Sequence, residues 1–486
     1  MPYRFAIPLI TVLFGLLLAS AHPSTVPVAN AAVSCSFGCM DMPFYYKPPS
    51  ASQPLVQTPT GEKPQSKLWY NDGYWWGSLF NNVAGNYRIY RLDWLTQVWQ
   101  DTGTVLDSRP ESKADVLWDG TYLYVASGGG FDLTGAGTRK ALDAVLFRYS
   151  YNPATKGYAK DFGPVTIRTG GAETLVLDKD TTGKLWITYT QNSKVYVNHS
   201  RASDSDWSPA AAMVVPTPSA SWTSLSPDDI STLVAFNGKI GVLWSNESSG
   251  QFSGSSDTAF YFAYHVDGAA DTAWTAAPIY RQPAAADDHI NIKSLQTDPS
   301  GNVYVMVKTS YNTLGSPQLL LIVGKKQSTG YSWTPYVESY RQDGQTRPLL
   351  LLDSENRKLY VFTSDEGGGN IYYKSTSMDN IQFASGAGTI FMTAGGYALN
   401  NLTSTKQAVN GATGIVVMAS HDNEAKIDSS AADYYFHNYI TLPGTGPTPT
   451  PKPTATATPK PTATVPPPTI VPGGGSDRVY VPLVER

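Results

Sequence analysis

A unit of about 55 residues recurs roughly seven times along the chain and constrains the fold more than any other feature. Each copy reads as an apolar strand, a tight turn, a second strand, a loop and a third strand. The copies begin near Ser66, Ala114, Glu173, Ile230, Ile290, Arg347 and Ser404. A unit this short cannot bury its own apolar face, so neighbouring copies must pack against one another.

Strand signals dominate the repeats and no long stretch has helical periodicity, which predicts an all-β protein. Alternating runs such as KLWITYT from Lys184 and KLYVFT from Lys358 end at Gly, Asn and Asp turns. The coils of a β-solenoid are shorter than these units, and a double β-sandwich would not keep one register through every copy. We therefore predict a seven-bladed β-propeller, with six blades as the alternative.

Two features indicate how such a ring would pack and close. A large aromatic follows the third strand in five copies, and we predict that it fills the wedge between neighbouring sheets: Trp99, Trp207, Trp274, Trp333 and Phe383. The last copy runs into a linker without a fourth strand. We predict that the stretch from Met40 to Lys47 supplies this outer strand, which removes two exposed sheet edges.

The beginning of the chain has the pattern of a secretory signal peptide. Arg4 precedes the apolar run 5–18, and the small residues Ala19 and Ala21 suit a signal peptidase. The mature chain is expected to start near His22, and a second site at 29–31 is the alternative. The run is shorter than the ~20 apolar residues that span a bilayer. No other segment qualifies, so no transmembrane segment is expected in the mature chain.

The chain has two cysteines, Cys35 and Cys39. Export would place them in an oxidising compartment, so we predict a disulfide that closes a small loop. Lipid modification of Cys35 is the alternative, but Ala-Val-Ser before it lacks the usual leucine. No His pair lies nearby at ligand spacing, which argues against a metal site.

After Leu442 the composition changes to a Pro/Thr tract that cannot assemble a core, and we predict a disordered linker. The chain then ends in VYVPLV from Val479. This ending resembles the Pro/Thr linker and V-Y-[LV]-P-L-V tail of exported proteins from filamentous green non-sulfur bacteria related to Chloroflexus. The resemblance implies a sorting or attachment signal, and a frayed terminus is the alternative. The expected organisation is signal peptide 1–21, N-terminal segment 22–62, propeller 63–442, linker 443–475 and tail 476–486.

Functional residues are expected on the loops that lead into the first strand of each copy and on those that join its second strand to its third, because both kinds open on one face of a propeller. The candidates lie on the first kind. They carry a mixture of arginines, carboxylates and one histidine, and the ligand-binding candidates are Arg109, Glu173, Asp228, Asp229, Asp287, Asp288, His289 and Arg347. Guanidinium groups pair with carboxylates, and Asp and Glu accept hydrogen bonds from sugar hydroxyls. The alternative is that these groups neutralise one another around a wet channel.

The stretch Ser200–Trp207 (SRASDSDW) resembles the Asp-box, S-x-D-x-G-x-x-W, of sialidase-like propellers. It keeps the first Ser and the final Trp, whereas Ala202 and Asp204 stand where Asp and Gly are expected. Tyr87–Tyr90 comes close to the F/Y-R-I-P element but lacks the proline. The resemblance therefore implies a propeller architecture and carries over no catalytic residues.

Several other functions find no support in the sequence. A net charge of −4, with scattered Lys and Arg, argues against a nucleic-acid partner. Asp178 and Asp180 precede Gly183 in a weakly calcium-like spacing, but no acidic residue completes the loop, so a β-turn is favoured and no cofactor is expected. No His lies near a G-x-S-x-G elbow, and no phosphate-binding glycine loop precedes a helix.

We therefore predict a secreted, monomeric propeller attached to the cell surface that binds an extracellular glycan or another surface macromolecule. One alternative is a carbohydrate-active enzyme, a hydrolase or lyase, whose site would use carboxylates, arginines and His289 at the channel end. The other is a structural component of a surface layer. The sequence does not decide among the three.

Overall fold

The computed structural model describes residues 35–44, 58–61, 63–129, 141–294, 300–393, 395, 398–421 and 433–444. These residues belong to one compact unit, and a second unit from Pro447 to Arg486 lies outside the described residues. The expected signal peptide and tail, and nearly all of the expected linker, also lie outside them. Within the described ranges, no helix is long and apolar enough to cross a membrane.

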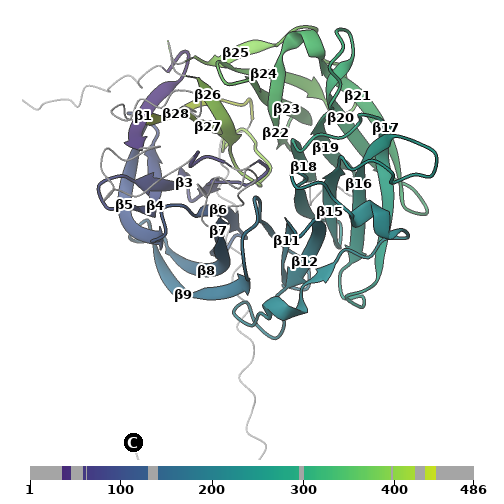
Figure 1. The fold of residues 1–486 in the computed structure, drawn as a ribbon. Helices are drawn as coiled ribbons and strands as arrows, with labels where there is room; N and C mark the ends of the chain where they lie inside the picture. The colour runs from purple at the N-terminus through teal and green to yellow at the C-terminus, as the bar shows by residue number, and fades with distance from the viewer. Residues whose placement is uncertain are drawn as a thin grey trace, which may run out of the picture. The chain divides into compact units, whose positions relative to one another are not determined.

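Seven antiparallel sheets of four strands follow one another around a ring (Figure 1), which confirms the seven-bladed propeller and excludes six blades. From the axis outwards, blades one to four consist of β2 (Leu68–Asn71), β3 (Tyr74–Asn81), β4 (Asn86–Asp93), β5 (Val98–Asp107); β6 (Lys113–Trp118), β7 (Tyr122–Gly129), β8 (Leu142–Asn152), β9 (Gly157–Arg168); β10 (Val176–Lys179), β11 (Leu185–Gln191), β12 (Lys194–His199), β13 (Met213–Val214); and β14 (Ser231–Phe236), β15 (Lys239–Asn246), β16 (Asp257–Val266), β17 (Trp274–Pro283).

Blades five to seven consist of β18 (Ile290–Ser294), β19 (Val303–Lys308), β20 (Pro317–Lys326), β21 (Tyr331–Tyr340); β22 (Gln345–Asp353), β23 (Lys358–Asp365), β24 (Ile371–Ser377), β25 (Thr389–Met392); and β26 (Leu399–Thr403), β27 (Ile415–His421), β28 (Asp433–Ile440), β1 (Cys39–Phe44). The described helical turns are three short 3-10 helices, at Pro209–Ala211, Ala220–Thr223 and Arg341–Asp343.

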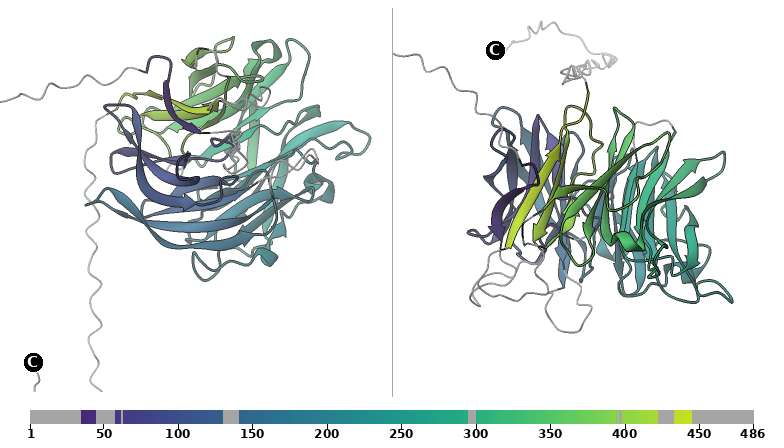
Figure 2. Two further views of the ribbon diagram at one scale, coloured as in Figure 1. Left: turned by 60° about the vertical axis from the view of Figure 1, so that its left-hand side comes forward. Right: turned by 90° about the horizontal axis from the view of Figure 1, so that it is seen from above.

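The ring closes through β1, which is the outermost strand of the seventh blade (Figures 1 and 2). It runs antiparallel to β28, with Phe44 opposite Asp433. The sequence predicted this pairing for Met40–Lys47, and it is confirmed for Met40–Phe44 within the strand Cys39–Phe44, while residues 45–47 lie outside the described residues. A disulfide joins Cys35 to Cys39 at its start.

Side chains of β1 anchor it to blades seven and one. The ring of Phe44 is fully buried and lies 5.0 Å from that of Tyr435 on β28. The imidazole of His437 is also fully buried, with Nδ1 2.8 Å from Asp41 Oδ2 and Nε2 3.0 Å from Gln97 Oε1 of blade one. The closing strand is therefore held by packing and by a buried polar network as well as by backbone hydrogen bonds.

The predicted aromatic residues pack each blade against the one before it. Trp274 of blade four lies 6.0 Å from Trp186 of blade three, and Trp333 of blade five lies 5.1 Å from Phe262 of blade four. Trp99 of blade one contacts the seventh blade, and Trp207 and Phe383 pack into the clusters they share with the preceding blades. The wedge-filling role predicted for these residues is confirmed.

Around the channel, polar side chains join the inner strands of different blades. The acceptor lies on one blade and the backbone N–H on the next, in the pairs Asp115 Oδ2 with Leu177 N (2.7 Å), Asp178 Oδ2 with Ala235 N (2.7 Å), Asn291 Oδ1 with Leu350 N (3.4 Å) and Thr403 Oγ1 with Lys67 N (3.0 Å). Inner strands of different blades belong to separate sheets, so these bonds satisfy N–H groups that no sheet ladder reaches.

Phe44→Ala tests the closure. Truncating this buried ring should lower the free energy of unfolding by about 3–5 kcal/mol, because it leaves a cavity between β1 and β28. The matched control is Phe37→Ala, since Phe37 is 56% exposed and its loss should be nearly neutral. Denaturant unfolding measures both variants, and equal losses would show that β1 does not close the ring.

Asp115→Ala tests the inner ring. The carboxylate accepts hydrogen bonds from Ser66 N and Leu177 N and pairs with Lys406. Its removal leaves these two buried N–H groups without their acceptor and the ammonium of Lys406 without its counter-ion. We expect a loss of about 3–5 kcal/mol in unfolding free energy. Asp161→Ala, at the more exposed ion pair with Arg148, should cost about 1 kcal/mol or less. A similar cost for both would contradict the role given to Asp115.

Candidate functional site

Several of the predicted ligand-binding residues meet at one end of the channel. Glu173, Asp229 and His289 lie within three residues before the inner strands of blades three, four and five, so the starts of these neighbouring strands bring them together. We call this end the mouth, and its residues are Lys63, Glu173, Asp228, Asp229, Glu247, Asp287, Asp288, His289 and Lys308.

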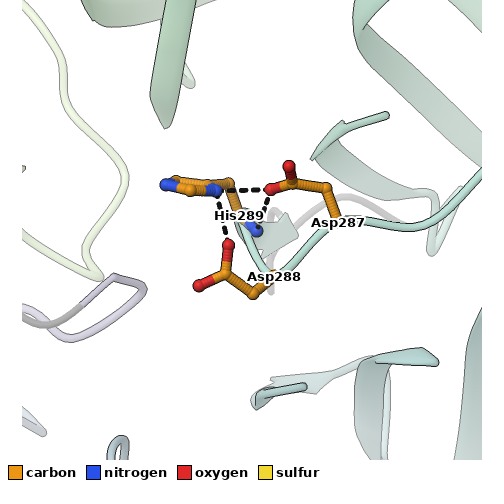
Figure 3. Close-up of side chains that lie close together, drawn as sticks. All are labelled: Asp287, Asp288 and His289. Carbon is orange, nitrogen blue, oxygen red and sulfur yellow. Dashed lines mark hydrogen bonds and ion pairs between the residues drawn. The ribbon is translucent and has the colours of Figure 1, made fainter. Parts of the chain in front are cut away.

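His289 is held by the two carboxylates that precede it (Figure 3). Its Nδ1 forms an ion pair with Asp287 and lies 2.6 Å from Asp288 Oδ1. Both carboxylates face the same nitrogen, so Nδ1 carries a hydrogen and, in the neutral ring, Nε2 is an acceptor. Nε2 points away from both carboxylates, and it is buried without a hydrogen-bond partner in the part of the chain that is described. Such an atom is costly unless a ligand or water meets it.

Two lysines extend the network across the ring. Lys63 forms an ion pair with Asp288, and its Nζ lies 3.7 Å from Glu173 Oε1. Lys308 Nζ lies 3.0 Å from Asp287 Oδ2 on the other side. The mouth therefore combines carboxylates and ammonium groups from blades three and five and from the segment before blade one.

The pKa values of the mouth carboxyls are shifted in opposite directions. Burial raises the pKa of Asp288, but His289 and Lys63 outweigh burial and hold it well below its usual value. Burial, followed by the charges of Asp229 and the neighbouring aspartates, raises the pKa of Glu247 to about 8. Burial also raises the pKa of Asp229 to about 6. Ionised Asp288 and protonated Glu247 thus coexist near neutral pH, which is the arrangement needed for proton donation and acceptance.

The mouth residues do not fit a resident metal ion. Asp287, Asp288 and His289 offer ligand atoms within 4.8 Å of one another. However, Lys308 and Lys63 already neutralise the two carboxylates, and His289 Nδ1 faces them as a donor. The donor set is therefore that of a hydrogen-bonded ion-pair network.

The weakly calcium-like stretch is a turn. Asp180 accepts hydrogen bonds from Thr182 N, Lys184 N and Trp186 Nε1, each at 2.9 Å, while Asp178 bonds Ala235 N of the next blade. The two carboxylates are thus used in separate structural bonds, and Gly183 adopts φ +92 within the turn. The β-turn interpretation accounts for all of these contacts.

Two of the predicted ligand-binding residues, Arg109 and Arg347, do not take part in the network that the described residues form at the mouth. Arg109 pairs with Asp107 at 2.7 Å and donates to the carbonyls of Ser127 and Asp143. Arg347 lies at a register shift in β22 with φ 48, and its buried Nε has no partner among the described residues. No hydrogen bond or ion pair within the described ranges joins either arginine to the mouth.

Sequence reasoning missed three mouth residues, Lys63, Glu247 and Lys308. Glu247 lies on the loop after β15, a type of loop that opens on the same face as the predicted residues, so its position was a usable signal. Lys308 ends β19, and Lys63 lies before the first blade, where no repeat pattern marks it. Only the folded ring brings these two lysines to Asp287 and Asp288.

The segment that carries Lys63 crosses the channel. Thr60 Oγ1 lies 2.8 Å from Ser420 Oγ of blade seven, Lys113 of blade two donates to Thr58 at 2.7 Å, and Gln65 donates to Leu175 O before blade three at 3.0 Å. Thr58, Thr60 and Gln65 are buried. The segment therefore separates the mouth from a cavity of about 350 Å³ that Pro64 lines on its other side.

No family model matches the chain, and no curated protein matches it in sequence. Solved structures similar to it include the polysaccharide lyase Uly1, with 10% identity, a TM-score of 0.46 and 84% of this chain and 99% of the other covered. A protein of unknown function from Dyadobacter fermentans shares 11% identity, with a TM-score of 0.42 and coverages of 68% and 94%. The NanB sialidase of Streptococcus pneumoniae shares 11%, with a TM-score of 0.33 and coverages of 65% and 50%. Similarity this low says nothing about the chemistry of the mouth.

Glu247→Gln tests the electrostatics of the mouth. The raised pKa means that folded Glu247 keeps its proton up to about pH 8, whereas the ordinary value is 4.5. The folded state therefore holds more protons than the unfolded state in this window, so the free energy of unfolding falls as pH rises from 4.5 to 8. Glutamine cannot ionise, and we expect a smaller fall in urea unfolding measured across this range. Asp379→Asn is the control, because the Arg357 guanidinium holds the pKa of this exposed carboxyl below its ordinary value of 3.8, so its removal should leave the slope between pH 4.5 and 8 unchanged. An unchanged slope in Glu247→Gln would contradict the assignment.

Proposed function

We propose that this chain is an exported, surface-attached propeller that binds an extracellular glycan at the mouth. The observation that carries the proposal is the convergence at one end of the channel of ionised carboxylates, the protonated carboxyl of Glu247, two ammonium groups and the buried His289 Nε2, which has no hydrogen-bond partner among the described residues. Sugar hydroxyls both donate and accept hydrogen bonds, so a polyhydroxylated ligand matches this mixture of donors and acceptors.

The proposed location rests on the two ends of the chain. The signal-peptide pattern predicts export, and the Cys35–Cys39 disulfide suits an oxidising compartment. The Pro/Thr linker and the VYVPLV tail would then display the propeller at a distance from the cell. Tethering raises the effective concentration of a binding module near a surface, which suits a glycan-binding role.

His289 favours a second candidate, a glycan hydrolase or lyase at the same mouth. Asp287 and Asp288 orient the imidazole and leave Nε2 as an available base, while Glu247, with a pKa of about 8, is a proton donor. General acid–base catalysis requires a base and an acid in the same site.

One experiment tests both candidates. The full chain is incubated with a library of bacterial and plant glycans, and retained and released sugars are analysed by mass spectrometry. Asp288→Asn should weaken retention about 10-fold or more, because it removes a charged hydrogen-bonding group. If the chain is an enzyme, new products appear with the parent, and His289→Gln abolishes them while retention persists.

Asp379→Asn, at an exposed carboxylate on the loop between β24 and β25, again serves as the control and should behave as the parent. Cleavage that survives His289→Gln would exclude the enzymatic role assigned to this residue. If the parent neither retains nor cleaves any glycan, the proposal is wrong and a structural role in a surface layer becomes the better account.

A further inference from the structure

The second end of the channel contains a cavity that the mouth does not share. Its volume is about 350 Å³, and its apolar walls come from the inner strands of blades two to five, with Leu117, Trp118, Val176, Leu233 and Ile292 among them. Pro64 borders it, and the exposed Ala408 lies at its rim, so it reaches solvent away from Lys63. This size is sufficient for a small organic ligand.

A buried lysine lies in the cavity wall without a carboxylate partner. Lys293 on β18 is 7% exposed, and its Nζ donates to Thr405 O at 3.2 Å. Within the described ranges no ion pair includes it, whereas Lys406 in the same wall lies 2.6 Å from Asp115 Oδ2. A buried ammonium that lacks a counter-ion is costly, which favours the neutral amine at Lys293.

Burial and the positive charge of Lys406 also favour the neutral amine at Lys293. Burial, and then the positive charge of Lys406, lowers the pKa of Lys293 to about 7, although Asp115 and Asp178 oppose the shift. A neutral amine in an apolar cavity is a nucleophile, unlike the ammonium of an ordinary lysine. The geometry and the charge therefore agree that Lys293 differs chemically from surface lysines.

We propose that this cavity receives a small ligand that carries an aldehyde or ketone, and that Lys293 condenses with its carbonyl group. The lone pair of Nζ forms a bond to the carbonyl carbon and gives a carbinolamine. The carbonyl oxygen then leaves as water with the two hydrogens of the amine, and an imine remains. No oxidant or reductant is needed. The inference is independent of glycan binding at the mouth, because it concerns different residues.

The charges around the cavity favour a carbonyl ligand over an anion. Asp178 lines the cavity, and Asp115 lies beside Lys406, so an added anion would face two carboxylates. A protonated imine instead carries a positive charge that these carboxylates stabilise. The apolar walls would pack against the body of the ligand and limit the access of water that hydrolyses the imine.

Reductive alkylation tests the proposal on the full, unmodified chain. The probe is butanal with cyanoborohydride, which traps the imine, and peptide mass spectrometry follows the alkylation of each lysine. At pH 7, Lys293 should react about 10-fold faster than Lys406 or the exposed Lys358, because a pKa lowered to about 7 leaves far more neutral amine. The preference should disappear in urea.

Two controls separate the cavity from general reactivity. An aldehyde coupled to high-mass dextran should modify Lys358 but not Lys293, because it cannot enter the cavity. Lys406→Gln removes the nearby positive charge and should slow the reaction of Lys293 with butanal at pH 7 several-fold. If Lys293 in the folded chain reacts no faster than Lys358, or if dextran aldehyde modifies it equally well, the proposal is overturned.

Discussion

The structure depends on how the innermost strands satisfy their backbone N–H groups. Each blade is a separate four-stranded sheet, so no ladder connects the inner strand of one blade to that of the next. Side-chain acceptors such as Asp115, Asp178 and Thr403 make that connection around the channel. Since a buried N–H without a partner costs about 1–3 kcal/mol, this ring of bonds favours one arrangement of the blades.

The same constraint shapes the chemistry of the channel. Asp115 and Asp178 are placed for structural reasons, yet they also supply the carboxylates around Lys293 and Lys406. The ammonium group of Lys406 in turn balances a channel that would otherwise concentrate negative charge in a poorly hydrated space. The two ends then differ because the N-terminal segment crosses between them, with Lys63 at the mouth and Pro64 beside the cavity.

The N-terminal part of the chain therefore has two separate structural roles. Its first described stretch closes the ring as β1 on the outside of blade seven, and residues 58–61 and 63–67 contact blades on different sides of the channel. Closure by β1 leaves the seventh blade with four strands, like the other six. The crossing segment adds a cation to the mouth, so ring closure and the electrostatics of the mouth involve the same part of the chain.

The sequence by itself determined the all-β class, a propeller with seven blades favoured over six, the wedge-filling role of residues such as Trp274 and Trp333, and the clustering of Glu173, Asp229, Asp288 and His289. These follow from local periodicity and from a repeat register that places equivalent loops on one face. Only the tertiary structure decided that Lys63 and Lys308 pair with the mouth carboxylates. It also decided that Arg109 forms an ion pair with Asp107 and that Lys293 lines a cavity. The physical reason is that a repeat pattern specifies which face a residue occupies, whereas ion pairs and cavities depend on distances between side chains from blades far apart in the chain.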